Sequence, residues 1–293
     1  MKEHGKDGMC FSVRAAARAV ATAVAVGSAC FWIARTHAGR ARVKTLRGAH
    51  GERVRVLQQG GVYQSATYLG KRRFEPVFEY IRAFDAMFEA EGVLRAQTGR
   101  GVERVLMLGG GGYSYPKHAL TTRLDLAMDV VELDAAVTAL ARRHFYLDEL
   151  EGLAGDRLRL IDADARSYMA DAAAAGVRYD VVANDCFAGA EPVRSLATVE
   201  ALGQAKGCLV PGGLYAANLV TGDGGESIEF LRDAMASAAA VFQHVHVVPC
   251  ADEAFGAEDN YLLIATDGDY AFAGEMPITH ELLGTPLFDA DVC

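Results

Sequence analysis

The sequence predicts an α/β protein built on a mostly parallel seven-stranded sheet whose last strand is antiparallel. Three observations support this. Strand and helix patterns alternate from residue 104 to residue 240, as in parallel sheets with crossover helices. Four glycines follow the first of these strands. The last two strands, 242–248 and 260–266, are joined by a segment without helical periodicity, so we expect them to be antiparallel.

Each element follows from its apolar pattern. Short apolar runs predict strands at 104–108, 128–133, 157–162, 179–184, 213–219, 242–248 and 260–266. Apolar residues at helical spacing predict helices at 116–123, 134–146, 165–175, 196–207 and 225–240. Six parallel strands and one antiparallel strand resemble the sheet of the Rossmann-like methyltransferases rather than that of NAD dehydrogenases. We expect the ligand at the carboxyl ends of these strands.

Two smaller regions precede the main domain, which is predicted at 101–293. Residues 51–100 are predicted to form a small β/α region. Val54 to Tyr68 alternates around Gly60-Gly61, which is typical of a β-hairpin, and Phe74 to Ala90 carries a helical apolar stripe. Residues 1–50 form a basic segment.

Charge is distributed unevenly along the chain. Residues 1–50 carry nine Lys or Arg and two acidic residues, a net charge of +7. Because the whole chain is −9, residues 51–293 carry −16. A body this acidic repels phosphate backbones, so we do not expect nucleic acid as a partner. The charge would suit a cationic small molecule, but a solvated acidic surface is the commoner explanation of such a charge. Six cysteines without a C-x-x-C pair favour a reducing, cytoplasmic compartment.

Residues 19–34 form a run of 16 residues without charge between Arg18 and Arg35. A full membrane span needs about 20 apolar residues. Three interpretations remain open: a packed or peripheral helix, a membrane anchor, and a signal peptide or misplaced start codon. With either of the first two, the basic residues that follow would keep the main domain on the cytoplasmic side.

The glycine run predicts a nucleoside site. Gly109, Gly110 and Gly111 follow a strand, and Glu132 ends the next strand, 23 positions after Gly109. Glycines let the backbone approach a ligand closely, and a carboxylate at this interval can accept hydrogen bonds from ribose hydroxyls. These four residues are therefore candidate cofactor-binding residues.

Two further strand ends carry candidate site residues. Asp164 is predicted either to accept a hydrogen bond from an adenine amino group, with Ala165 beside the base, or to cap the next helix. Asp185 ends the fourth strand and is the candidate catalytic residue, as an acceptor for the proton of an incoming amine. His244 and His246 alternate without a third ligand, so no metal site is predicted.

These residues together resemble the spermidine synthase (polyamine aminopropyltransferase) family over roughly residues 54–266. The matching positions are Leu108-Gly-Gly-Gly, Glu132, Asp164 with the small residue after it, Asp185, Tyr63-Gln64, and Leu209 to Asn218. The resemblance implies decarboxylated S-adenosylmethionine as donor, a cofactor contact from Gln64, an amine acceptor and a homodimer.

The departures from the family change the predicted reaction. Spermidine synthases carry an Asp directly after the glycines, where this chain has Gly112, and their polyamine-side motifs are missing. We therefore expect S-adenosylmethionine as donor and methyl transfer to an unidentified small acceptor. The alternatives are aminopropyl transfer, a catalytically inactive nucleoside-binding module, perhaps tethered at the membrane by residues 19–34, and an NAD-dependent oxidoreductase. The last is disfavoured because Ser114 replaces the third glycine of G-x-G-x-x-G.

Overall fold

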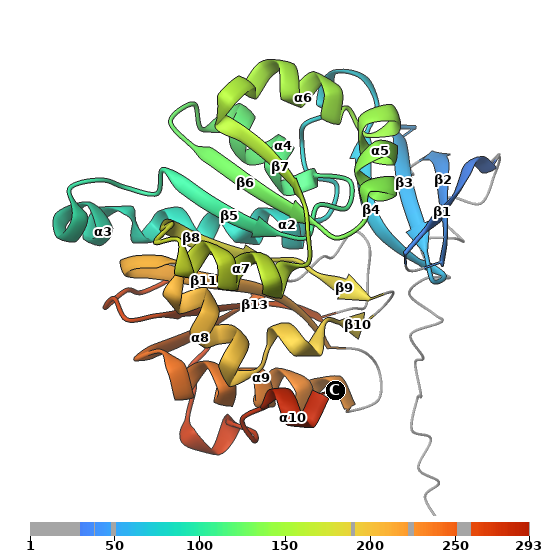
Figure 1. Cartoon of the computed structure of the whole chain (residues 1–293). Helices are drawn as coiled ribbons and strands as arrows, with labels where there is room; N and C mark the ends of the chain where they lie inside the picture. The colour runs from blue at the N-terminus through green and yellow to red at the C-terminus, as the bar shows by residue number, and fades with distance from the viewer. Residues whose placement is uncertain are drawn as a thin grey trace, which may run out of the picture.

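A seven-stranded sheet forms the centre of the protein (Figure 1). The computed structural model describes residues 30–37, 39–47, 51–188, 191–221, 226–250 and 259–292. In spatial order the strands are β12 (His244–Cys250), β13 (Asp259–Thr266), β11 (Leu209–Thr221), β8 (Tyr179–Asn184), β5 (Arg104–Leu108), β6 (Ala127–Glu132) and β7 (Leu158–Asp162). β13 runs antiparallel to both of its neighbours, and the other pairs are parallel. The predicted sheet is confirmed. Its antiparallel strand, β13, lies between β11 and the edge strand β12.

Helices cover both faces of this sheet. Alternate residues of β5 point to opposite faces: Val105 and Met107 belong to one core cluster, and Leu106 and Leu108 to the other. The first face is covered by α4 (Ser114–Thr122), α5 (Ala135–His144) and α6 (Leu147–Ala154) together with α2 (Glu79–Ala83) and α3 (Glu91–Thr98). The second is covered by α7 (Ala165–Ala174), α8 (Val199–Gly207) and α9 (Glu226–Val241). Strands buried on both faces explain the continuous apolar runs in the sequence.

The predicted helix at 134–146 differs from the observed elements at its end. Asp134 accepts a hydrogen bond from the Ala136 amide at 2.9 Å and caps α5, as the sequence predicted. α5 stops at His144, because Tyr146 adopts a left-handed backbone with φ of 62°. A separate helix, α6, then begins at Leu147, which the sequence analysis did not predict.

A second, antiparallel sheet precedes the main sheet. Its strands are β1 (Cys30–Thr36), β2 (Gly39–Arg47), β3 (Arg53–Gln59) and β4 (Val62–Tyr68), paired in that order. The predicted hairpin is confirmed: Gly60 and Gly61 join β3 to β4 with φ of 60° and 93°, values that glycine adopts easily. The boundary predicted at residue 50 falls between β2 and β3 of this one sheet.

One interpretation of residues 19–34 was a helix. This prediction is wrong for residues 30–34, which form the start of β1. The aromatic and β-branched residues Phe31, Trp32 and Ile33 suit a strand paired with β2. Residues 19–29 lie outside the described part of the chain. No helix within the described ranges has the length and apolarity needed to cross a membrane.

The helix predicted at 74–90 starts later than expected. α2 (Glu79–Ala83) continues into the 3₁₀ helix η2 (Phe84–Ala90) and then α3 (Glu91–Thr98), which ends at Gly99 with φ of 80°. Pro76 restricts the residue before it and lacks an amide hydrogen, which keeps the preceding segment out of the helix.

The remaining short elements are η1 (Gly70–Arg72), η3 (Gly155–Arg157), β9 (Phe187–Ala188), β10 (Glu191–Pro192), η4 (Arg194–Leu196), η5 (His280–Leu282) and α10 (Asp289–Val292).

Lys117 of α4 is buried between the two sheets, with 2% of its surface exposed. Its ammonium donates hydrogen bonds to Thr67 Oγ1 and the Phe145 carbonyl, both at 3.0 Å. Burial without a carboxylate partner lowers the pKa of Lys117 to about 7. Because the folded state holds this proton less tightly than the unfolded state, the free energy of unfolding should rise with pH between about 7 and 10.5.

We therefore expect Lys117→Met to stabilise the protein most near pH 7. The gain, on the order of 2–4 kcal/mol before the loss of the two hydrogen bonds, should shrink as pH approaches 10. Urea unfolding at pH 7, 8.5 and 10 measures it. The control is Lys206→Met, which removes a Lys paired with Asp267 at 2.6 Å. If the free energies of unfolding of wild type and Lys117→Met differed by the same amount at every pH, the prediction would be contradicted.

Candidate functional site

A cavity of about 240 Å³ lies at the carboxyl ends of β5, β6, β7 and β8. This is the edge where the parallel sheet was expected to bind its ligand. All eight predicted site residues line the cavity: Gln64, Gly109, Gly110, Gly111, Glu132, Asp164, Ala165 and Asp185. Residues from distant parts of the sequence therefore meet around one space, although their contacts with a ligand remain a prediction.

Three of the four glycines in the run, Gly109, Gly110 and Gly112, leave no room for a side chain. Gly109 has φ of 89°, and its amide donates to the Val131 carbonyl at 2.9 Å. A Cβ on Gly109 would lie 2.6 Å from the carbonyl oxygen of Asp185. A Cβ on Gly110 would lie 2.7 Å from the ring of Tyr113. Glycine is required at position 109 for close backbone packing between the ends of β5 and β8, and at position 110 for packing against the Tyr113 ring.

Glu132 holds this loop in place. Its Oε2 accepts hydrogen bonds from the amides of Gly110 and Gly111, both at 3.0 Å, and Oε1 accepts from the Asp134 amide at 3.0 Å. A carboxylate offers about four acceptor sites, so these three bonds leave capacity for a ligand hydroxyl. The loop contact was missed from the sequence, where Glu132 was considered only for ribose.

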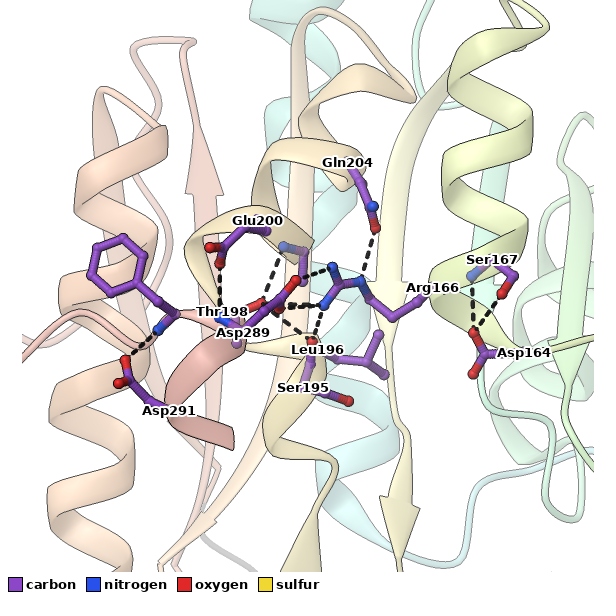
Figure 2. Close-up of polar contacts among 12 residues, drawn as sticks. Asp164, Arg166, Ser167, Ser195, Leu196, Thr198, Glu200, Gln204, Asp289 and Asp291 are labelled. Carbon is purple, nitrogen blue, oxygen red and sulfur yellow. Dashed lines mark hydrogen bonds and ion pairs between the residues drawn. The ribbon is translucent and has the colours of Figure 1, made fainter. Parts of the chain in front are cut away.

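Asp164 is the cap of α7, which was one of its two predicted roles. Its Oδ1 accepts from the Ser167 amide at 2.9 Å and from Ser167 Oγ at 3.1 Å (Figure 2). Within the described residues, Oδ2 accepts no hydrogen bond, and Asp164 is exposed where it lines the cavity. Oδ2 is therefore free to accept a hydrogen bond from a nucleobase, the second predicted role.

Asp185 is half-buried at the end of β8. Its amide donates to the Leu108 carbonyl at 2.9 Å, and Asn218 of β11 donates to its Oδ1 at 2.9 Å. Burial raises the pKa of Asp185 to about 7, although the hydrogen bond from Asn218 acts in the opposite direction. A carboxylate with this pKa can accept a proton at neutral pH.

One part of the cavity lining is apolar and aromatic. α2 contacts β12, β13 and α4, and it contributes Tyr80 and Ile81 to the lining. Tyr115 and Phe187 complete this apolar wall. No motif in the sequence identified these four residues, because they come from separate elements that meet only in the fold.

Ser65 occupies the space beside Gly112. A Cβ on Gly112 would lie 2.3 Å from Ser65 Oγ and 3.1 Å from the ring of Phe145. Ser65 Oγ lies 3.0 Å from Ser114 Oγ, which donates to the Ala66 carbonyl at 3.1 Å. An aspartate at position 112, as in spermidine synthases, would therefore not fit without moving β4.

The cavity lining is acidic. Glu132, Asp134, Asp164 and Asp185 lie along it, whereas Arg166 is already paired with Asp289 outside the lining, at 2.9 Å. Such a concentration of one sign of charge favours a cationic ligand. No cluster of three or more His, Cys, Asp or Glu side chains suited to a metal ion occurs within the described ranges.

Sequence comparison links part of the chain to one curated protein. No protein-family model matches the chain. A 116-residue segment, 40% of the chain, is 34% identical to the polyamine aminopropyltransferase of Vibrio vulnificus (strain CMCP6). That segment spans only 37% of the relative's length, so the match by itself does not extend to the whole relative.

Structural comparison extends over most of the chain. A probable spermidine synthase from Corynebacterium glutamicum superposes with a TM-score of 0.63 and 22% identity, covering 83% of this chain and 81% of that one. The spermidine synthase of Thermotoga maritima gives 0.58 and 18%, covering 82% and 73%. Human methyltransferase-like protein 13, in complex with SAH, gives 0.52 and 21%, covering 70% and 86%.

The sheet order and these neighbours define the class: the chain has a Rossmann-like fold of the methyltransferase type. Within that class its fold is spermidine synthase-like, which confirms the predicted resemblance. The relatives and neighbours named above are transferases.

Proposed function

We propose that the protein is a transferase that moves an alkyl group from a sulfonium nucleoside of the S-adenosylmethionine type to an amine. The observation that carries this proposal is Asp185, a carboxylate with a pKa of about 7 beside a glycine loop in an acidic cavity. The polyamine aminopropyltransferase that is similar over part of the chain supports an amine as acceptor.

The cavity fits such a donor. Gly109 and Gly110 leave the loop free of side chains, and Gly111 has no atom within 4 Å of where a Cβ would stand. Glu132 and Gln64 would hold the ribose side, and Asp164 and Ala165 the base. The acidic lining would stabilise a sulfonium, which supplies an activated carbon for transfer.

Asp185 would act on the acceptor. An ammonium ion has no free electron pair, so an amine must lose its proton before or during attack. Asp185 would accept that proton, and Asn218 would keep the carboxylate oriented through its hydrogen bond to Oδ1. The apolar wall formed by Tyr80, Ile81 and Phe187 would exclude water from this step.

The transferred group is open between two candidates. Aminopropyl transfer is supported by the curated relative, a polyamine aminopropyltransferase. Methyl transfer from S-adenosylmethionine is supported by Gly112, because Ser65 fills the place where an aspartate could bind the amino group of the decarboxylated donor. Loss of a charge-assisted hydrogen bond of that kind typically costs about 1.5–3 kcal/mol.

Calorimetric titration of the full chain tests the proposal. The ligands are S-adenosylmethionine, its decarboxylated form, 5′-methylthioadenosine and NADH. The full chain is needed because β1 and β2 belong to the first sheet. We expect the sulfonium nucleosides to bind and NADH not to bind. Tighter binding of S-adenosylmethionine supports methyl transfer, and tighter binding of the decarboxylated form supports aminopropyl transfer. Binding of NADH alone would overturn the proposal.

A further inference from the structure

Arg166 lines the cavity and connects α7 to η4, α8 and α10 (Figure 2). Its Nε donates to Gln204 Oε1 at 2.8 Å, and Nη1 donates to the Ser195 carbonyl at 2.7 Å. Nη1 and Nη2 donate to the two carboxylate oxygens of Asp289, at 2.9 and 3.0 Å. A bidentate pair of this kind fixes the plane of the guanidinium as well as its position.

These contacts join two walls of the cavity. One wall is Asp164 and Ala165, which directly precede Arg166 at the start of α7. The other wall is Ser195 and Leu196 of η4, whose main chain Arg166 holds through the Ser195 carbonyl. The separation between the two walls therefore depends on where the Arg166 side chain is held.

Asp289 determines that position from α10, the last described helix. Besides Arg166, its carboxylate accepts a hydrogen bond from Thr198 Oγ1 at 2.7 Å, and its amide donates to Glu200 Oε2 at 3.1 Å. Arg166 and Thr198 hold the pKa of Asp289 at about 2, so this group stays ionised at any pH used for an assay. Thr198 also caps α8, which anchors Asp289 to the core.

We propose that Asp289, acting through Arg166, is a positioning residue for the base end of the nucleoside, so that α10 takes part in donor binding without touching the donor. The inference rests on the proposed function, because it requires a nucleobase between the two walls. It goes beyond that function by assigning a role to a residue 123 positions from Arg166 in the sequence.

The test is calorimetric titration of the full chain with adenosine and with 5′-methylthioadenosine. In Asp289→Asn, the amide nitrogen faces a guanidinium hydrogen and the negative charge is lost. We expect the Kd of both ligands to rise by the same factor, about tenfold, because the change acts on the base that they share. Asp289→Glu retains the carboxylate and should recover most of the affinity.

Asp291→Asn is the matched control. Asp291 lies on the same short helix, and its carboxylate accepts a hydrogen bond from the Phe288 amide without reaching Arg166 (Figure 2). Asp291→Asn should bind adenosine and 5′-methylthioadenosine with the wild-type Kd. Thermal unfolding of both variants separates lost affinity from lost folding. If Asp289→Asn does not fold, Gln204→Leu removes a single Arg166 contact and should still raise both Kd values.

Two results would overturn the inference. If wild type binds both nucleosides and Asp289→Asn binds them equally well, the pair of Arg166 and Asp289 plays no part in binding and the proposed function stands. If wild type binds neither nucleoside, the inference fails because no base lies between the two walls, and the titration with S-adenosylmethionine and its decarboxylated form tests the proposed function separately.

Discussion

Asp185→Asn is expected to lower kcat for alkyl transfer by about 10²- to 10⁴-fold while leaving the Kd of the nucleoside donor within a few-fold. The side chain keeps its size and can still lie beside Asn218, but it can no longer accept a proton. Steady-state kinetics with the donor identified by calorimetry, together with titration of the same variant, measures both quantities.

Cys186→Ala is the matched control for this variant. Cys186 follows Asp185 and also lines the cavity, but the proposed reaction does not use its thiol. Its kcat should remain within a few-fold of wild type. If Asp185→Asn were as active as Cys186→Ala, Asp185 would not be the base. If no transfer were measurable even in wild type that binds the donor, the inactive nucleoside-binding module would be supported instead.

The pH dependence gives a second measurement of Asp185. A base must be deprotonated, so wild-type kcat should fall tenfold per pH unit below a pKa of about 7 and level off above it. Stability should show the opposite trend. Since the folded state holds this proton more tightly than the unfolded state, the contribution of Asp185 to the free energy of unfolding falls as pH rises from about 4 to 7. Asp185→Asn should lack that fall.

Gly109→Ala is expected to abolish nucleoside binding and to lower the free energy of unfolding by about 2–4 kcal/mol. The added Cβ would lie 2.6 Å from the Asp185 carbonyl oxygen, at a φ of 89° that alanine adopts poorly. The ends of β5 and β8 would have to separate, which would displace both the loop and Asp185. Urea unfolding and calorimetric titration measure the two effects.

Gly152→Ala is the control for this substitution. Gly152 lies within α6, and no atom stands within 4 Å of its would-be Cβ. Alanine there should be neutral or stabilising by about 0.5–1 kcal/mol, because it reduces the entropy of the unfolded chain. Equal effects of the two substitutions would show that the contact between Gly109 and Asp185 does not matter.

The main sheet could be predicted because its signals are local. β5 and β8 were predicted to the residue, since each is a short apolar run that ends at glycine or at a polar residue. The capping role of Asp134 was likewise visible from its place before a helical pattern. β1 was missed because Cys30 to Ala34 continues an alanine-rich run, and a short apolar run does not distinguish strand from helix.

The cavity was predictable only in part. The glycine loop, Glu132, Asp164 and Asp185 follow predicted strands, and parallel strands bring their carboxyl ends to one edge. Asn218 and the pair of Arg166 and Asp289 could not be found this way. Their partners lie 33 and 123 positions away, and no local pattern encodes a contact at that separation. The steric conflict between Ser65 and Gly112 depends in the same way on how the first sheet packs against α4.

The turn after the first described strand lines the cavity, and the last described helix supports it through Arg166, which constrains how the protein should be handled. The turn after β1 places His37 in the lining, and its amide donates to the carboxylate of Asp134. At the other end, Asp289 of α10 holds Arg166. We expect a purification tag to change the affinity for nucleosides if it displaces either element. Affinities measured with tagged protein should be repeated after the tag has been removed.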